Sequence, residues 1–324
     1  MDRSSARLTT LDGLRGMAAI LAMLFHGGPT SPIAMPRGYL AVDMFFVLSG
    51  FVIAQNYEPR LASGMTLRQF VRQRLIRVYP MFFVGTLVGL LLWGARPFAF
   101  LMIPDPGNPV LFPSNGPMWS LLFELIVNVL FALFALRLGP RGLGAILAVS
   151  GVLLWFAAKA PHGLDAGAFW HNAPAGMVRT VYSFTAGVAA FRLHRHLRIE
   201  RRETPLAWAL LPLLIVLFWP DYENRALADA LVALFVLPAI VWLGAMWQAP
   251  GARAMEALGA MSFPLYCIHL PIIYVVIART GPQAQVLYLA MPVMALALDR
   301  YVDRPVRRVL SRLGRATAPA LTPA

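Results

Sequence analysis

The chain has 324 residues, of which 59% are hydrophobic and 13% charged, and its formal net charge is +13. A soluble domain would have roughly a quarter charged residues, so this composition excludes an ordinary soluble globular protein. The apolar residues fall in blocks of about twenty, the length of a helix that crosses a hydrocarbon core of ~30 Å. The composition therefore predicts an all-α fold, a polytopic membrane helix bundle in the lipid bilayer.

Ten apolar blocks are predicted to span the membrane. In chain order they cover residues 9–27, 39–57, 78–95, 118–136, 142–159, 176–193, 205–220, 226–247, 258–278 and 284–301. The first block follows Arg3 and Arg7 as in a signal peptide, but no small-residue cleavage site follows it directly. We therefore expect this helix to be retained. The single cysteine, Cys267, lies within a block, which excludes a disulfide framework.

The positive charge is distributed by membrane side, which argues against nucleic-acid binding. Basic segments follow the second span (RLASGMTLRQFVRQRLIR), the sixth (RLHRHLRIERR) and the last (RPVRRVLSRLGR). With a cytoplasmic N-terminus, all three segments are cytoplasmic, as the positive-inside rule requires. We predict cytoplasmic N- and C-termini, a multi-pass protein of the cell inner (cytoplasmic) membrane, and a short, basic, disordered cytoplasmic tail at residues 309–324.

The first span, LDGLRGMAAILAMLFHGG, contains ionisable residues near both of its ends. Arg15 and His26 are eleven residues apart, so they project from one helix face about 16 Å apart along the axis. Asp12 lies one turn before Arg15 and is placed to pair with it. Ionisable residues within membranes are costly and normally face the bundle interior or a wet cavity, which makes this face a candidate functional site.

Two acidic residues are predicted to lie at a depth near that of His26. Asp43 lies a few residues into the second span and Glu124 about six residues into the fourth, with Trp119 expected at the interface above it. We expect these three groups to cluster. The structural alternatives are an interhelical hydrogen bond for His26, an arginine pair for Asp43 and a structural role for Glu124. His269, in the ninth span, is expected to pack or to line a pocket.

Composition and spacing leave a transporter and an intramembrane enzyme open. A metal site is not predicted, because the histidines and acids have no ligand spacing within one helix. A purely structural or receptor role would leave polar residues at matched depth on three helices without an explanation.

The ordered motifs of the chain resemble the acyltransferase-3 family of integral-membrane acyltransferases. The likeness begins at LDGLRGMAAILAMLFH, where ten residues separate Arg15 from His26. It continues through GYLAVDMFFVLSGFVI, FVRQRLIRVYP, PMWSLLFELIVNVLF and MSFPLYCIHLPIIY to DRPVRR, so residues 1–308 are predicted as one acyltransferase-3-like transmembrane domain. Two positions depart from the family pattern: Glu124 has no second acidic residue or Gln beside it, and Asp303 replaces a Glu.

The resemblance implies an O-acyltransferase that moves an acyl group, usually acetyl, from acyl-CoA to a hydroxyl of a cell-envelope or secreted carbohydrate. Acyl-CoA (acetyl-CoA) would be a co-substrate, with no cofactor bound permanently, and the acceptor a carbohydrate or lipid-linked glycan. Arg15, Arg74 and Arg77 are then expected to bind the donor phosphates by charge-assisted hydrogen bonds.

A histidine suits the chemistry that this resemblance implies. His26 is expected to be the base that takes the hydroxyl proton, or the carrier of the acyl group. Glu124 or Asp43 would orient its imidazole as a third group does in a catalytic triad. Two alternatives stay open: a transporter or flippase for a glycolipid or polysaccharide precursor, and a succinyl transferase in which Arg179 supplies the extra cation.

Overall fold

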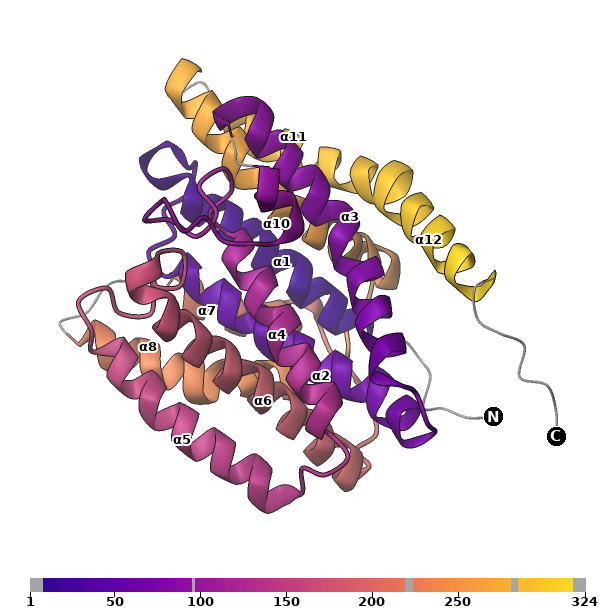
Figure 1. The fold of residues 1–324 in the computed structure, drawn as a ribbon. Helices are drawn as coiled ribbons and strands as arrows, with labels where there is room; N and C mark the ends of the chain where they lie inside the picture. Colours follow the sequence, from indigo (N-terminus) through magenta and orange to yellow (C-terminus); the bar gives the residue numbers. More distant parts are fainter. Residues whose placement is uncertain (1–7, 95–96, 219–223, 281–284, 317–324) are drawn as a thin grey trace.

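The computed structural model describes residues 8–94, 97–218, 224–280 and 285–316, and the chain is 79% helical, which confirms the all-α class. The longer helices are α1 (Thr9–His26), α2 (Ala41–Ala62), α3 (Leu67–Trp93), α4 (Met118–Phe134), α5 (Pro140–Ala158), α6 (Ala173–Leu197), α7 (Leu206–Phe218), α8 (Arg225–Leu231), α9 (Leu237–Met246), α10 (Ala252–Thr280), α11 (Gln285–Leu298) and α12 (Arg304–Ala316) (Figure 1).

Shorter elements join these helices. They are the 3₁₀ turns η2 (Gly28–Thr30), η3 (Gly38–Leu40), η4 (Pro97–Leu101) and η5 (Trp170–Asn172), the π-helical turns η6 (Val232–Val236) and η8 (Asp299–Asp303), and the strands β1 (Arg202–Glu203) and β2 (Trp247–Gln248). The two strands pair in parallel and tie the loop after α6 to the loop after α9. The turn η6 joins α8 to α9 as one continuous helix.

A helix lies at each of the ten predicted spans. In the part of the chain that the structure describes, five helices are long and apolar enough to cross a membrane: Gly38–Ala62, Leu67–Trp93, Pro140–Ala158, Arg225–Met246 and Ala252–Val275. Among the others, α1 and α6 carry charged residues, and α4, α7 and α11 have only 17, 13 and 14 residues. The ten-span topology and the cytoplasmic termini stay predictions.

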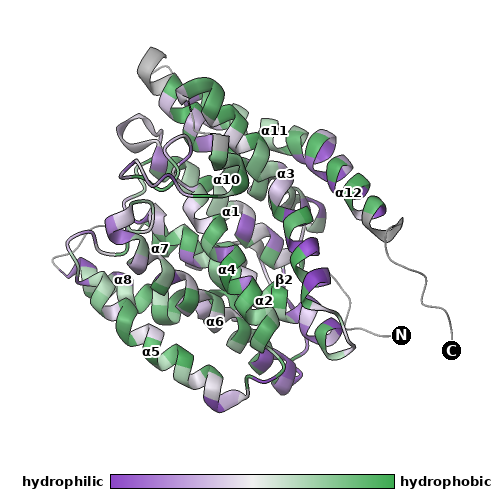
Figure 2. Ribbon diagram, in the orientation of Figure 1, coloured by the Kyte–Doolittle hydropathy of each residue, from purple (hydrophilic) through white to green (hydrophobic). Residues whose placement is uncertain are grey.

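Helix α1 lies in the middle of the bundle. It packs along α10 and also contacts α2, α7 and α9 (Figure 1). Helices α3 and α5 lie at the outside (Figure 1), and the residues of α5 and of the C-terminal half of α3 are largely apolar (Figure 2). Leu91 is 74% exposed and Phe156 63% exposed, as expected for side chains that contact lipid rather than water.

Glycines allow two helix pairs to approach closely. A methyl group at Gly16 of α1 would meet the backbone of Leu258 in α10. In the second pair, a methyl group at Gly50 of α2 would clash with the Phe184 carbonyl of α6, and one at Gly187 of α6 would clash with the Val47 carbonyl of α2. Small residues at such contacts are the usual means of packing helices in membranes.

Helix α3 begins at Leu67, well before the predicted span at residue 78. The reason is a capping box, in which Thr66 accepts a hydrogen bond from the Gln69 backbone while the Gln69 side chain accepts one from the Thr66 backbone. The basic segment that we expected in a loop is therefore helical, and it carries Arg74 and Arg77 on the same rigid element as the span.

The C-terminal tail differs from the prediction. Residues 309–316, which we expected to be disordered, continue helix α12, while residues 317–324 lie outside the described part of the chain. The arginines of this segment are spaced for a helix with one basic face, a pattern that helical periodicity explains. Arg3 and Arg7, which set the predicted orientation, also lie outside the described residues.

The close contact between α2 and α6 predicts a stability difference between two glycine positions. Gly187→Ala should destabilise the protein by roughly 1–3 kcal/mol, because the added methyl group clashes with backbone that cannot move aside. Gly144→Ala on α5 is the matched control, since a methyl group there meets nothing within 4 Å. Thermal unfolding in detergent measures both, and equal melting temperatures would contradict the packing described here.

Candidate active site

Two histidines from different helices meet near one end of the bundle. His26 ends α1 and His269 lies within α10, and the distance from His26 Nδ1 to His269 Nε2 is 3.1 Å. The ring centroids are 5.0 Å apart. Each Nδ1 also lies near the carbonyl oxygen four residues earlier in its own helix, at 2.8 Å from Ala22 and 3.0 Å from Leu265.

These contacts define the tautomers of the neutral pair. A carbonyl oxygen can only accept, so the Nδ1 of each histidine carries a proton and donates it. His269 Nε2 then has a lone pair, and the single Nδ1–H of His26 is shared between the Ala22 carbonyl and this nitrogen. The remaining nitrogen of His26, Nε2, is left with a free lone pair. This arrangement leaves His26 Nε2 able to accept a proton, while His269 contacts the other ring nitrogen.

His26 lines a cavity of about 830 Å³, here called the histidine cavity. Its walls come from α1, α2, α3, α4, α6, α10 and the loops before α2, α4 and α6. They include Phe25, His26, Tyr39, Val42, Trp93, Trp119, His162, Phe169, His171, Arg179, Tyr266 and Tyr274. Within the described residues no group of three or more His, Cys, Asp or Glu is placed to hold a metal ion. The aromatic walls of the histidine cavity suit a ligand with an apolar face and hydroxyl groups.

The arginines predicted to bind a donor line a second cavity of about 630 Å³, here called the middle cavity. Arg15, Arg74 and Arg77 all lie in its wall, so the structure brings the three together. Arg15 donates to Ser262 Oγ and to the Gly259 carbonyl of α10, each at 3.0 Å, and also pairs with Asp12 as its spacing predicted.

The two cavities share part of one wall. Val42 and Tyr266 line both of them. The Tyr266 hydroxyl lies 2.7 Å from Ser120 Oγ and 3.2 Å from the Pro117 carbonyl, so the start of α4 holds this ring in place. Tyr266 therefore separates the arginine-lined cavity from the cavity that contains His26.

Asp43 does not contact His26 but forms a buried ion pair with Arg179 of α6. Arg179 Nη2 lies 2.6 Å from Asp43 Oδ2 and Nε lies 3.2 Å from Oδ1, and both side chains are almost fully buried. Arg179 also donates to the carbonyls of Ala166 and Tyr39, which ties two loops of the histidine cavity to the bundle. This is the arginine pair that the sequence left open as the alternative for Asp43.

Glu124 also lies away from His26, so the predicted cluster of three ionisable groups does not form. Its carboxylate accepts hydrogen bonds from Ser49 at 2.6 Å and Arg74 at 3.1 Å, and it lines the middle cavity. The prediction counted the depth of Glu124 from the start of the fourth apolar block, because it assumed that every span begins at the membrane surface. Trp119, expected at the interface, is instead 6% exposed and packs against Phe46 inside the bundle.

The reason is the loop before α4, which enters the bundle. Asn115 is buried and donates to the carbonyls of Gly85 and Cys267, at 3.3 and 2.7 Å. Helix α4 therefore begins deep in the protein, and Glu124 lies nearly two turns deeper still. A buried asparagine that satisfies two carbonyls is a tertiary contact, and the apolar pattern of the fourth span carries no sign of it.

The sequence drew attention to both His269 and His26 but not to the contact between them. The place of His269 in a motif that is otherwise apolar was the available signal, and the contact with His26 depends on how α1 and α10 align. No pattern within either helix fixes that alignment, because it is set by packing between segments more than two hundred residues apart.

Fold and site together define a multi-helix membrane protein with a histidine in one cavity and arginines in the next. The family model described as an acyltransferase domain, Acyl_transf_3, matches residues 8–299. The chain belongs to this acyltransferase-3 family, as the sequence motifs predicted, and it is a membrane O-acyltransferase.

Three relatives illustrate the range of the family. Protein 2 in the picA locus of Rhizobium radiobacter is 33% identical over 47% of this chain and 95% of its own length. BcsY of Komagataeibacter xylinus, named as a membrane-bound transacylase, is 25% identical over 82% of this chain and 72% of its own length. The exopolysaccharide production protein ExoZ of Rhizobium meliloti is 28% identical over 34% of this chain and 38% of its own. No solved structure matches the chain.

The Asp43–Arg179 pair predicts a stability defect with a characteristic rescue. Asp43→Leu should destabilise the protein by about 3–5 kcal/mol, because it leaves the Arg179 charge buried without a partner. The double variant Asp43→Leu with Arg179→Met should be more stable than Asp43→Leu alone, since no unpaired charge remains. Unfolding in detergent measures the stability of the wild type and both variants. A double variant no more stable than Asp43→Leu would contradict this account of the pair.

Proposed function

We propose that this acyltransferase moves an acyl group, most simply acetyl, from acyl-CoA to a hydroxyl of a cell-envelope or secreted carbohydrate. The observation that carries the proposal is the lone pair on His26 Nε2, in a cavity that shares Tyr266 with an arginine-lined cavity. The resemblance of the motifs to acyl-CoA-dependent enzymes suggests the donor. The geometry supports donor binding in the middle cavity and acyl transfer in the histidine cavity.

In this proposal His26 acts as the general base. Nε2 takes the proton of the acceptor hydroxyl as its oxygen attacks the thioester carbonyl, so that a carbon–oxygen bond forms and the carbon–sulfur bond breaks. The proton then passes to the leaving CoA sulfur. His269 positions the ring, because its Nε2 accepts from the His26 Nδ1–H throughout. The alternative that the sequence left open, His26 as acyl carrier, would use the same nitrogen.

The arginines support an anionic donor that enters from the basic end. Arg15 and His26 lie about 16 Å apart on α1, which places the middle cavity and the histidine cavity at opposite ends of the helix. A flexible pantetheine arm suits a route of this length between a phosphate-binding end and a reacting end. All three arginines pair with a carboxylate, but the side chains of Arg15 and Arg77 are 31% and 32% exposed and that of Arg74 only 12%. Arg15 and Arg77 are therefore the better candidates for direct phosphate contact.

The acyl group is proposed to be neutral. A succinyl group would need a cation with hydrogen-bonding capacity to spare, and Arg179 was the candidate. Its guanidinium is held by Asp43 and by two backbone carbonyls, so its charge and its directed donors are already used. An uncharged acyl group such as acetyl needs no such partner.

The acceptor is proposed to be a carbohydrate, or a glycan linked to lipid, that enters the histidine cavity. The names of ExoZ and the membrane-bound transacylase BcsY support an exopolysaccharide or another envelope glycan as its class. The aromatic side chains of Phe169 and Trp93 at the cavity wall suit stacking on a sugar ring.

The helix directions support the predicted topology in the inner membrane. Contacts in register show that α1 and α10 are parallel, since Gly16 lies at Leu258 while His26 lies at His269. Helices α2 and α6 are also parallel, with Asp43 at Arg179 and Glu58 at Arg192. In the predicted topology of ten spans with both termini cytoplasmic, successive spans cross the membrane in opposite directions. Spans one and nine (α1 and α10) must then be parallel, and so must spans two and six (α2 and α6).

The first experiment measures the acetyl content of purified envelope polysaccharide by proton NMR. A deletion strain is complemented with the wild-type gene or with His26→Ala at equal membrane expression. We expect acetyl signals to return with the wild-type chain alone, because His26→Ala removes the base. Unchanged acetylation in all strains, with glycan retained inside the cell, would favour transport of a precursor, and loss of another ester signal would identify a different acyl group.

The role of His269 predicts a graded response to substitution. His269→Gln should retain part of the activity, because a glutamine oxygen can accept from the His26 Nδ1–H, whereas His269→Leu should lower kcat about 100-fold. The readout is kcat and KM in purified protein, with unfolding temperature as the check on structure. A residue that served only in packing would give the leucine variant the higher activity.

A further inference from the structure

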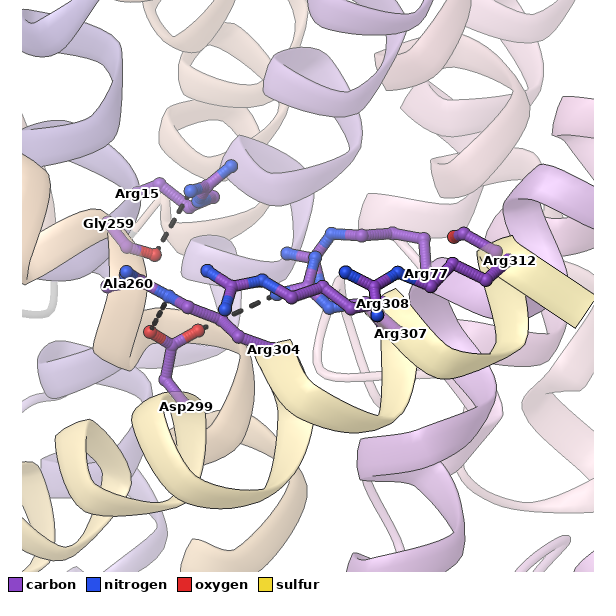
Figure 3. Close-up of a pocket in the computed structure, with 10 residues that line it drawn as sticks. Arg15, Arg77, Gly259, Ala260, Asp299, Arg304, Arg307, Arg308 and Arg312 are labelled. Atoms are coloured by element: carbon purple, nitrogen blue, oxygen red, sulfur yellow. Dashed lines mark hydrogen bonds and ion pairs between the residues drawn. The ribbon is translucent and has the colours of Figure 1, made fainter.

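A strongly cationic pocket of about 670 Å³ lies between the C-terminal helix and the bundle (Figure 3). Six arginines line it, here called the arginine pocket: Arg15, Arg77, Arg304, Arg307, Arg308 and Arg312. They come from α1, α3 and α12, segments far apart in the chain. Four of them lie on α12, within the basic segment RPVRRVLSRLGR, and the fold brings Arg15 of α1 and Arg77 of α3 to the same cavity.

The positive charge of the arginine pocket exceeds the charge of the acids beside it. Asp299 pairs with Arg304 at 2.6 Å, and Asp303 pairs with Arg307 at 2.7 Å. Among the residues that the structure describes, no carboxylate pairs with Arg308 or Arg312.

The surroundings of Arg307 disfavour its positive charge. Partial burial, and after it the nearby charge of Arg77, lowers the pKa of its guanidinium, while Asp303 opposes the change. A polyanion in the pocket would relieve this repulsion.

Helix α12 turns its basic face toward this pocket and its apolar face outward. Val309 is 54% exposed and Leu313 62% exposed, on the side of the helix opposite the arginines. Apolar and polar residues alternate in bands along α12 in Figure 2. A helix that only completed the fold in water would have the reverse orientation, so the inward arginines are placed for a ligand and the outward side chains for lipid.

The arginine pocket continues into the middle cavity. Arg15 and Arg77 line both, just as Val42 and Tyr266 line both the middle cavity and the histidine cavity. The three cavities thus form a series that begins at unpaired arginines and ends at His26. A ligand that matches the series has a polyanionic head, a slender neutral arm and a reactive end.

We propose that the arginine pocket binds the phosphorylated nucleotide of acyl-CoA, with Arg308 and Arg312 of α12 contacting its phosphates. This inference rests on the proposed function and adds a subsite to it. The nucleotide would dock outside the membrane spans, and the pantetheine arm would pass Arg15 and Arg77 into the middle cavity. Guanidinium groups suit phosphate because they offer paired donors in a planar fork.

The test is the affinity of the purified full chain for free CoA and for pantetheine, which lacks the nucleotide and its phosphates. Isothermal titration in nanodiscs of phosphatidylcholine measures both. We expect the double variant Arg308→Gln with Arg312→Gln to bind CoA at least about tenfold more weakly than wild type and pantetheine equally well. Arg253→Gln is the matched control, an exposed arginine outside the pocket, and should bind CoA as wild type does.

The remaining outcomes separate this inference from the proposed function. If wild type binds CoA and the double variant binds it equally well, the subsite is wrong and the donor assignment stands. If wild type binds neither CoA nor pantetheine, the proposed donor itself is wrong. A double variant that keeps its CoA affinity but loses a thermal shift induced by phosphatidylglycerol or by inorganic phosphate would assign the arginines to that anion and overturn the nucleotide subsite.

Discussion

The parallel contact between α1 and α10 is the interaction on which the rest of the structure depends. Because Gly16 has no side chain, α1 can approach the backbone of α10 at Leu258. Polar residues near both ends of α1 then form hydrogen bonds with α10. At one end Arg15 donates to Ser262 and Gly259, and at the other His26 donates to His269. A shift of one turn between the helices, 5.4 Å, would break both sets of bonds together. The position of the base is therefore coupled to the position of the arginine.

Two buried ion pairs join segments that are far apart in the chain. Asp43 with Arg179 joins α2 to α6, and Arg37 with Asp229 joins the loop after α1 to α8. An unpaired charge in a dry interior is strongly unfavourable, so these pairs fix the alignment of helices whose apolar surfaces alone would allow sliding. Through Arg179 and Tyr39 they also hold the walls of the histidine cavity. The residues left for chemistry are the ones that line the cavities.

The sequence predicted the fold class, the helices and the family, because these depend on block length, periodicity and ordered motifs. It also predicted that Arg15 and His26 share a face of α1 and that Arg74 and Arg77 meet Arg15 in one cavity. It could not place Glu124, because depth was counted from the start of an apolar block and the block begins inside the bundle. Helix α12 was missed for a related reason: a run of arginines was treated as an orientation signal, although its spacing is that of one helix face.

The loop that displaces Glu124 from His26 also determines how the cavities are joined. The same loop supplies the Pro117 carbonyl, and the first turn of α4 supplies Ser120, and these two groups hold the Tyr266 hydroxyl between the middle cavity and the histidine cavity. Had α4 begun at the membrane surface, Glu124 would lie near His26, but no group would fix the ring that separates the two cavities. Such a separation matters for a thioester, since an open channel would let water reach the acyl group as readily as a sugar hydroxyl. In the proposed function, the contact with His269 therefore takes the orienting role that we first assigned to Glu124.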